Sequence, residues 1–268
     1  MKYIMVTGAY GGMGRKTVEV LKNQGFGVIA LDKTTDAAEK NVIPIKVDIT
    51  DADSVNRAFE RVKSVTNELY AIVHLAGIYM LDSLVEIESD SFANAFKVNL
   101  FGAFLINKTF RPLLKSGSRI VIMTSELAPL DPLPFTGIYA VTKSALDKYA
   151  YSLRMELQLS DICVSVIRAG AVDTGMLGAS TASLDRFCTN TKLYSCNAER
   201  FKSIVDSVEA RCVPPERVAG KIQTVLSKRN PKFAYSINRN PLLLLLNALP
   251  KRLQLWIIKQ LLNQAKIE

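Results

Sequence analysis

Short, uninterrupted apolar runs recur along the chain, and most are followed by a longer segment whose apolar residues fall three or four positions apart. The runs are predicted to be strands at residues 3–7, 26–31, 43–47, 70–75, 119–123, 162–167 and 233–237. The longer segments are predicted to be helices at residues 12–23, 51–65, 91–114, 139–159 and 215–226. Strands that are apolar throughout are typical of a parallel sheet covered on both faces by helices. The pattern therefore predicts an α/β fold with one doubly wound domain of the Rossmann type.

The alternation continues through the 268 residues without an internal repeat, a low-complexity segment or an obvious linker. This length suits one large α/β domain or two small ones. We expect one domain over residues 1–240, in which residues 176–214 form a long insert, and a C-terminal extension over residues 241–268. Inserts of this length are usually lids or binding loops.

The net charge of +9 is concentrated near the C-terminus. Residues 221–268 hold nine Lys or Arg and one acid, so the rest of the chain is nearly neutral. The extension joins five consecutive leucines, 242–246, to a basic segment in which Leu253, Ile257 and Leu261 share one helical face. This pattern suits contact with anionic head groups at a membrane surface. It equally suits a cover over a substrate pocket or a contact between two copies of the chain.

Other features narrow the class of protein. The chain has no run of about 18 apolar residues, so we expect no membrane-spanning helix. The apolar run at the N-terminus is too short for a signal peptide. The four cysteines are scattered without a CxxC pair, and the single histidine, His74, is remote from them in sequence. We therefore expect a reduced, cytoplasmic setting, with or without peripheral membrane contact, and neither a metal site nor a nucleic-acid partner.

The segment TGAYGGMG, residues 7–14, follows the first predicted strand and opens the first predicted helix. This is the context of a phosphate-binding turn, where glycines let the backbone approach a pyrophosphate and the helix N-terminus supplies free N–H groups. Two spacings fit, namely Gly8, Gly12 and Gly14, or Gly8, Gly11 and Gly14. They belong to different kinds of nucleotide-binding enzyme. The glycines alone are weak evidence, because such clusters also form ordinary tight turns.

Asp32 ends the second predicted strand, where an acid can accept hydrogen bonds from the hydroxyls of an adenosine ribose. Its charge would repel a 2′-phosphate, so it favours NAD over NADP as the cofactor. Lys33 and Arg15 weaken this inference, because either cation could attract the same phosphate. Asp32 could instead cap a turn.

Tyr139 and Lys143 lie four residues apart and therefore share one face of a predicted helix. A phenol with the ordinary pKa of about 10 is a poor base, but a nearby ammonium group lowers that pKa. Lowering it to about 7 requires roughly 4 kcal/mol, to which a cationic nicotinamide would contribute. Tyr139 could then exchange a proton with an alcohol or carbonyl oxygen while hydride moves to or from the cofactor. Tyr-x-x-x-Lys alone is common and usually marks a solvated helix face.

Two more polar residues strengthen this interpretation. Ser125 follows the fifth predicted strand, at the sheet edge where ligands bind, and its hydroxyl could hold the reacting oxygen. Asn99 lies among apolar residues inside a predicted helix, where an asparagine is unfavourable unless its amide has a partner. We expect Asn99 to hold a water near Lys143.

The chain resembles the classical short-chain dehydrogenase/reductase family in the order and spacing of Thr7-Gly8-x-x-x-Gly12-x-Gly14, Asn99, Ser125 and Tyr139-x-x-x-Lys143. The resemblance covers about residues 1–240. It implies that Tyr139 is the acid/base and that Ser125 orients the substrate. It also implies that Lys143 holds the ribose and tunes Tyr139, and that Asn99 supports a proton relay. Members of the family are usually dimers or tetramers through the helices that carry Asn99 and Tyr139.

The same resemblance implies a set of cofactor contacts. They are Thr7, Gly8, Gly12, Met13, Gly14, Asp32, the pair Asp48 and Ile49 beside the adenine, Ala76, Gly77, Tyr139, Lys143, and Val172 and Thr174 against the nicotinamide carboxamide. The resemblance also decides between the glycine spacings. The spacing that uses Gly11 is typical of extended members with a larger C-terminal substrate domain, whereas fewer than 100 residues follow Val172. Gly11 then becomes a permissive extra glycine.

The chain departs from the family pattern at two positions. His74 begins HLAG where the family usually has NNAG, whose first side-chain amide ties strands together. We expect His74 to replace that tie only partly, and to be structural rather than catalytic. Ala169 stands where a proline usually precedes Gly170, so we expect a looser strand end without the loss of a reacting group.

Two apolar segments flank the expected site: the proline-containing stretch 127–137 and the insert 176–214. The insert's large apolar residues are Met176, Leu177, Leu184, Phe187, Tyr194 and Phe201. They predict a lipophilic secondary alcohol or ketone as substrate, unless they simply pack against the sheet.

The extension, with its leucine–proline spacing, resembles the retinol and hydroxysteroid dehydrogenases of the same family. That resemblance favours a hydroxysteroid, including the bile-acid type. Retinol and an acyl-chain carbonyl are the alternatives. A non-catalytic cofactor sensor on the same fold is the rival from another class of protein.

Overall fold

A seven-stranded sheet forms the centre of the computed structural model, which describes residues 1–209 and 211–263. Neighbouring strands pair in parallel, in the order β3-β2-β1-β4-β5-β6-β7. The bounds are β1 Tyr3–Thr7, β2 Gly27–Asp32, β3 Val42–Lys46, β4 Leu69–His74, β5 Leu114–Ser125, β6 Cys163–Ala169 and β7 Ala234–Ile237. The strand order reverses between β1 and β4, so the carboxyl ends of these strands frame the crevice where such sheets bind ligands. The predicted doubly wound α/β domain is confirmed.

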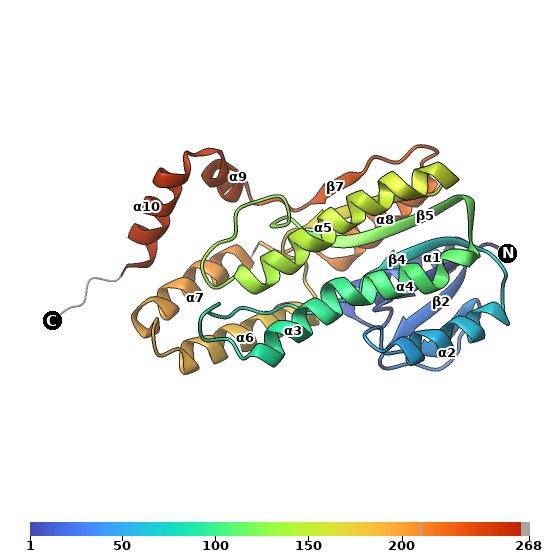
Figure 1. Ribbon diagram of the computed structural model, residues 1–268, viewed down its shortest axis with the longest axis horizontal. Helices are drawn as coiled ribbons and strands as arrows, with labels where there is room; N and C mark the ends of the chain where they lie inside the picture. The colour runs from blue at the N-terminus through green and yellow to red at the C-terminus, as the bar shows by residue number, and fades with distance from the viewer. Residues whose placement is uncertain (210, 264–268) are drawn as a thin grey trace.

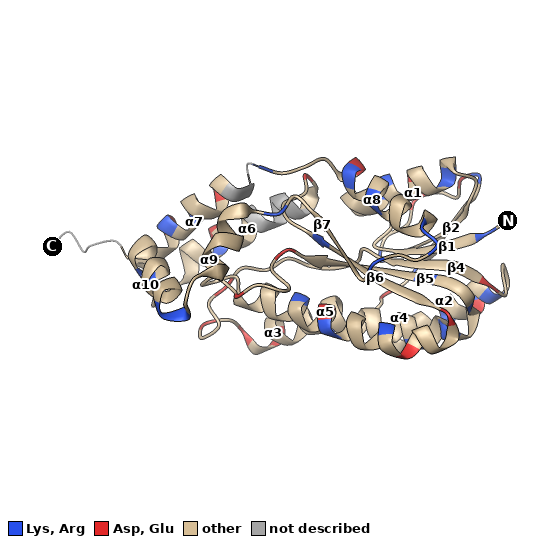
Figure 2. Cartoon of the chain, turned by 90° about the horizontal axis from the view of Figure 1, so that it is seen from above, with Lys and Arg blue, Asp and Glu red and all other residues tan. Residues whose placement is uncertain are grey.

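Helices cover both faces of the sheet, as Figure 2 shows in edge view. One layer contains α1 (Gly12–Asn23) and α8 (Pro215–Ser227), and the other contains α2 (Ala52–Lys63), α4 (Gly102–Phe110) and α5 (Gly137–Leu157). Consecutive strand residues alternate between two cores: Met5 and Ile29 lie in one, Ile4 and Val28 in the other. Because both faces are buried, the inner positions of the central strands β1, β2 and β4 are apolar.

The predicted helix over residues 91–114 is instead three helical pieces. They are α3 (Ser89–Phe96), a π-helical turn η1 (Lys97–Phe101), and α4, which a 3-10 turn η2 (Arg111–Leu113) ends. The wider π turn contains Asn99, whose amide bonds outside the helix. Pro112 lies in this 3-10 turn and has no backbone N–H with which to continue the α-helical hydrogen bonds.

The fifth strand is longer than predicted, because β5 begins at Leu114 and ends at Ser125. The expected loosening at Ala169 is not found. Ala169 pairs with Ser125 on one side and with Ile237 on the other, and Gly170 N donates to Ile237 O at 3.0 Å. Two neighbouring strands hold this strand end, so a proline is not needed to fix it.

His74 ends β4 and ties it to the helix layer rather than to another strand. Its Nε2 lies 2.9 Å from Asn107 Oδ1, and Asn107 Nδ2 donates to Tyr149 Oη at 3.1 Å. Burial lowers the pKa of His74 to about 4, although the Asn107 hydrogen bond opposes this shift. A buried, neutral His74 in this network fits the expected structural role.

The insert and the extension lie together at the end of the molecule opposite the N-terminus (Figure 1). Their helices are α6 (Gly175–Asn190), α7 (Ser195–Glu209), α9 (Pro241–Ala248) and α10 (Lys251–Leu262). Residues of the insert form a small separate core with Leu81 of the loop after β4; its members are Leu81, Leu184, Phe187, Ala198 and Phe201. The side chains of Met176 and Leu177 lie outside the described residues. No helix in the described parts of the chain is long and apolar enough to cross a membrane.

Candidate functional site

A largely apolar pocket lies at the carboxyl ends of the central strands, covered by α7 and α9. Its polar lining consists of Thr124, Ser125, Glu126, Thr136, Tyr139, Lys143 and Thr174. Its apolar lining includes Met13, Leu75, Met123, Leu127, Leu133, Phe201, Ile204, Val205 and Leu243. Residues of the stretch 127–137, of the insert and of the extension thus share one cavity with the expected catalytic residues.

Three of the four expected catalytic residues line this pocket. Ser125 is the last residue of β5, and Tyr139 and Lys143 come from the N-terminal turns of α5. Lys143 is buried, with its Nζ 5.7 Å from the centre of the Tyr139 ring and 3.4 Å from Met123 O, to which it donates. The ring of Tyr79 lies 4.5 Å from the Tyr139 ring and helps to fix its orientation.

The expected lowering of the Tyr139 pKa is wrong for the protein by itself. Burial raises the pKa of Tyr139 to about 12; a hydrogen bond with Ser125 lowers it in part and the Glu126 carboxylate raises it. Burial also lowers the pKa of Lys143 to about 8. The physical reason is that the phenol loses its hydration, and this outweighs the attraction of an ammonium group that does not contact it.

Asn99 lies directly behind this group. Its Oδ1 accepts from Ile78 N at 2.8 Å, and its Nδ2 donates to Ile78 O and to Thr142 Oγ1, each at 3.0 Å. Asn99 thereby fastens the loop after β4 to α5. A Cβ atom on Gly77 would lie 3.1 Å from Asn99 Oδ1 and 3.3 Å from Lys143 Nζ, so the three groups meet closely. The water near Lys143 stays a prediction.

The glycine turn fits the spacing Gly8, Gly12 and Gly14. Gly8 has a φ of +68°, and its Cβ would lie 2.6 Å from Ala76 N. A Cβ on Gly14 would lie 2.0 Å from Gly8 O, and one on Gly12 would lie 2.6 Å from the Cβ of Thr174. At Gly11 the nearest such contact is 3.4 Å, which is ordinary van der Waals distance. Side chains are therefore excluded at the first three positions and tolerated at Gly11.

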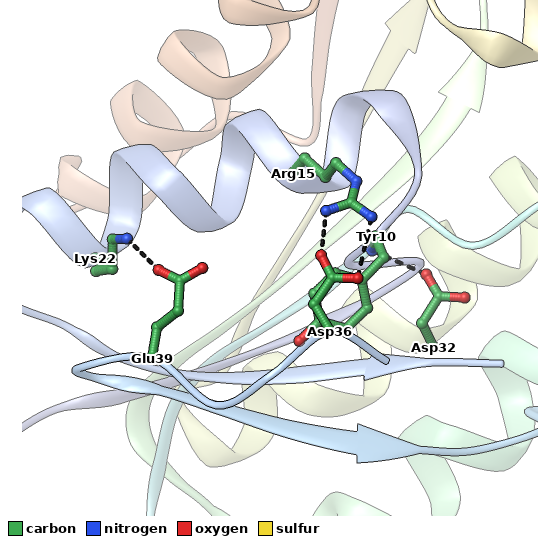
Figure 3. Close-up of polar contacts among 6 residues, drawn as sticks. All are labelled: Tyr10, Arg15, Lys22, Asp32, Asp36 and Glu39. Atoms are coloured by element: carbon green, nitrogen blue, oxygen red, sulfur yellow. Dashed lines mark hydrogen bonds and ion pairs between the residues drawn. The ribbon is translucent and has the colours of Figure 1, made fainter. Parts of the chain in front are cut away.

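Asp32 anchors the glycine turn from the end of β2. Its Oδ2 accepts from Tyr10 N at 2.9 Å, and its Oδ1 accepts from Lys33 N at 2.7 Å (Figure 3 shows the first contact). Asp32 therefore accepts hydrogen bonds from backbone N–H groups, as the alternative interpretation of Asp32 as a turn cap predicted. The carboxylate still lies at the edge of the turn, where a ribose would approach.

Acids neutralise both cations that weakened the preference for NAD. Arg15 pairs with Asp36, as Figure 3 shows, and Lys33 Nζ lies 3.1 Å from Asp48 Oδ2. The Asp36 partner raises the pKa of Arg15, so this guanidinium stays charged and engaged. A 2′-phosphate would have to break these ion pairs and approach Asp32.

The remaining expected cofactor residues surround the same crevice. Thr7 Oγ1 accepts from Ala76 N at 3.4 Å, which joins the ends of β1 and β4. Burial raises the pKa of Asp48, but hydrogen bonds from Thr50 and the Lys33 ion pair outweigh it, so that pKa is lowered overall. Ile49 packs against Gly102 of α4. Met13, Gly77, Val172 and Thr174 line the pocket itself.

Several pocket residues were not singled out from the sequence, among them Glu126 and Leu243. Glu126 follows Ser125, is buried, and accepts from Asn240 N at 2.6 Å; burial raises its pKa. In the sequence, only the position of Glu126 directly after Ser125 could have indicated that it lies in the pocket. Leu243 lines the pocket from α9, which agrees with the pocket-cover alternative for the extension, but the sequence does not distinguish it from the four neighbouring leucines.

Comparison with known proteins agrees with this geometry. Residues 2–185 match the family model described as short chain dehydrogenase. An uncharacterised oxidoreductase of Escherichia coli, YbbO, is 31% identical over 88% of this chain and 85% of its own. The 3-ketodihydrosphingosine reductase of Bacteroides thetaiotaomicron is 23% identical over 86% of this chain and 85% of its own. Estradiol 17-beta-dehydrogenase 2 of Mus musculus is 28% identical over 87% of this chain and 67% of its own.

Proposed function

The chain belongs to the short-chain dehydrogenase family, and we propose that it is an NAD-preferring enzyme that interconverts a lipophilic secondary alcohol and its ketone. The family assigns it to oxidoreductases that act on CH–OH or carbonyl groups with NAD or NADP. One observation carries the proposal most directly: Ser125, Tyr139 and Lys143 meet in an apolar pocket next to the glycine turn.

The residues present fit a dinucleotide, because a Cβ on Gly8 or Gly14 would collide with backbone at the turn. The bound nicotinamide would supply the hydride acceptor or donor. Ser125 and Tyr139 would hold the substrate oxygen, and the Tyr139 hydroxyl would take or give its proton. Since the pKa of Tyr139 is about 12 in the protein by itself, the catalytic phenolate depends on additional positive charge near Lys143. A cationic nicotinamide provides charge of that sign.

NAD is the proposed cofactor because Asp32 faces the turn and the nearby cations are paired with acids. A lipophilic substrate is proposed because leucine, methionine and phenylalanine side chains dominate the pocket wall. A hydroxysteroid leads, with support from the estradiol dehydrogenase among the relatives. An acyl-chain carbonyl follows, with support from the sphingoid-base reductase, and retinol remains an alternative.

We also propose a homodimer or homotetramer. Large apolar side chains of α4 and α5 are exposed, among them Phe104, Tyr151 and Met155, with Phe101 just before α4. These are the helices through which the family resemblance predicts assembly. The cytoplasmic setting stays a prediction.

Replacing Tyr139 with phenylalanine tests the proposed chemistry against a non-catalytic sensor. Tyr139→Phe should reduce turnover by at least about a hundredfold, because general acid–base catalysis contributes that much or more. Binding of the reduced cofactor, followed by its fluorescence, should change little. Tyr3→Phe, at the start of β1 and outside the pocket lining, is the matched control. Full turnover in Tyr139→Phe would contradict the assignment.

A further inference from the structure

The outer face of the C-terminal extension is unusually apolar for a surface. Leu242 and Leu245 on α9 are each 64% exposed, and Leu255 and Trp256 on α10 are 66% and 58% exposed. Leu253 and Leu261 add 42% and 47%. We call these six side chains the leucine face. Several large apolar side chains exposed on two adjoining helices make this end of the molecule a candidate interaction site.

The leucine face belongs to a fixed structure, because the body of the protein holds the extension at three points. At its start, Asn240 N donates to the buried Glu126 carboxylate at 2.6 Å. In its middle, Asp131 binds Asn247, Lys251 and the buried Gln254. At its end, side chains of α7 bind carbonyls of α10: Arg200 donates to Leu261 O at 2.7 Å and Asn197 to Leu262 O at 2.8 Å.

Helix α9 also lies between the pocket and the leucine face. Leu243 lines the pocket that contains Tyr139, whereas its neighbours Leu242 and Leu245 point outward. A single helix therefore separates the proposed substrate from whatever covers the leucine face.

Charge distinguishes between the two simplest occupants, a lipid surface and a second copy of the chain. Residues 241–263 contain Lys251, Arg252 and Lys259 and no acid. Within the described parts of the chain, Arg252 and Lys259 have no ion pair, and only Lys251 has one, with Asp131. Figure 2 shows blue segments on α10 without red ones. A symmetric contact would bring these cations together without acids to neutralise them, whereas an anionic lipid surface complements them.

We propose that the leucine face docks on a membrane that carries anionic lipids, with Leu242, Leu245 and Trp256 in the interface and Arg252 and Lys259 on the head groups. The pocket then opens beside the lipid phase, from which a lipophilic alcohol would enter past α9. This inference deepens the proposed function and rests on it for the substrate. The docking itself requires no turnover.

Trp256 permits a direct test, because it is the only tryptophan in the chain and lies on the leucine face. The full-length protein is mixed with vesicles of phosphatidylcholine, with or without phosphatidylserine, and its tryptophan emission is recorded. Phosphatidylserine vesicles should shift the emission to shorter wavelength, and lipids brominated in the acyl chain should quench it. The double variant Arg252→Glu/Lys259→Glu should weaken vesicle affinity at least about tenfold, since each cation contributes about 1 kcal/mol.

Controls separate docking from misfolding and from self-association. Lys46→Glu changes an exposed cation on β3, far from the leucine face, and should bind vesicles like the unmodified chain. An absent shift, or an equal shift with neutral vesicles, would overturn the proposal. The proposal would also be overturned if the emission shift occurred without vesicles and increased with protein concentration while sedimentation showed a dimer. That result would mean that a second copy of the chain covers the leucine face. A chain that reduces NAD with soluble alcohols but fails these tests would lose this inference and keep its proposed function.

Discussion

At the scale of single residues, the central feature is a pair of buried ionisable groups whose hydration is lost. The pKa of Tyr139 rises to about 12 and that of Lys143 falls to about 8, both chiefly through burial. Each shift disfavours the charged form that the proposed chemistry uses. Positive charge from a bound cofactor would therefore stabilise the Tyr139 phenolate. Strongly shifted pKa values of this kind cluster at functional sites.

Lys143 gives this account a pH signature. The folded-state pKa of about 8 lies below the ordinary lysine value of 10.5, so between these pH values the unfolded chain holds a proton that the folded protein has lost. The destabilisation is full below about pH 8 and disappears as the pH rises past about 10.5. Lys143→Met should therefore raise the free energy of unfolding near pH 7 by up to about 3 kcal/mol while abolishing turnover.

Thermal unfolding of both proteins from pH 6 to pH 10.5 measures this effect. The melting temperature of Lys143→Met should exceed that of the unmodified protein at low pH, and the difference should shrink as the pH increases. Lys148→Met, which changes another lysine of α5, is the control. A variant that is less stable at every pH would mean that burial of the charge does not dominate at Lys143.

At the scale of elements, the π-helical turn η1 positions the residues that support the pocket wall, because it contains Asn99. It directs the Asn99 amide at both backbone groups of Ile78 and at Thr142, so that the loop after β4 is fastened to α5. An ordinary helical turn would shift the register of every later side chain. A local irregularity at a functional site is common for π turns.

Asn99→Ala would leave the N–H and C=O of Ile78 without these partners. Loss of such buried hydrogen bonds should reduce the free energy of unfolding by about 1–3 kcal/mol and lower turnover, because Gly77 and Lys143 meet at the same point. Chemical denaturation and steady-state kinetics measure the two effects. Asn94→Ala, on the exposed side of α3, should change neither. Unchanged stability in Asn99→Ala would contradict the fastening role.

The sequence predicts most elements well, because periodicity determines them locally. Six of the seven strands and four of the five predicted helices fall within two residues of the predicted bounds, and the glycine turn, Asp32, Ser125 and Tyr139 occupy the expected ends of strands and helices. The failures are contacts between distant segments. Asn99 in the η1 turn accepts a hydrogen bond from Ile78, and Glu126 accepts one from Asn240, and neither partner is close in sequence. The full length of β5 follows from its pairing with neighbouring strands. The shift of the Tyr139 pKa depends on burial, which spacing does not reveal.

At the scale of the whole molecule, the sheet builds the cofactor crevice, and the C-terminal half of the chain builds the pocket roof. The insert contributes Phe201, Ile204 and Val205, and the extension contributes Leu243. The same roof carries the leucine face on its outside. The proposed substrate contacts and the proposed membrane contact therefore lie on the two sides of one helical layer, and the residues proposed for hydride transfer lie at the sheet edge below it.

One measurement tests the central claim most directly. The purified protein is mixed with NAD or NADP and with a panel of hydroxysteroids, bile acids, retinol and short alcohols, and the near-ultraviolet absorbance of the reduced nicotinamide is followed. The account predicts turnover of a lipophilic secondary alcohol, with kcat/KM for NAD at least about tenfold above that for NADP, and loss of that preference in Asp32→Ser. Cofactor binding without turnover of any substrate would contradict the account and favour a sensor instead.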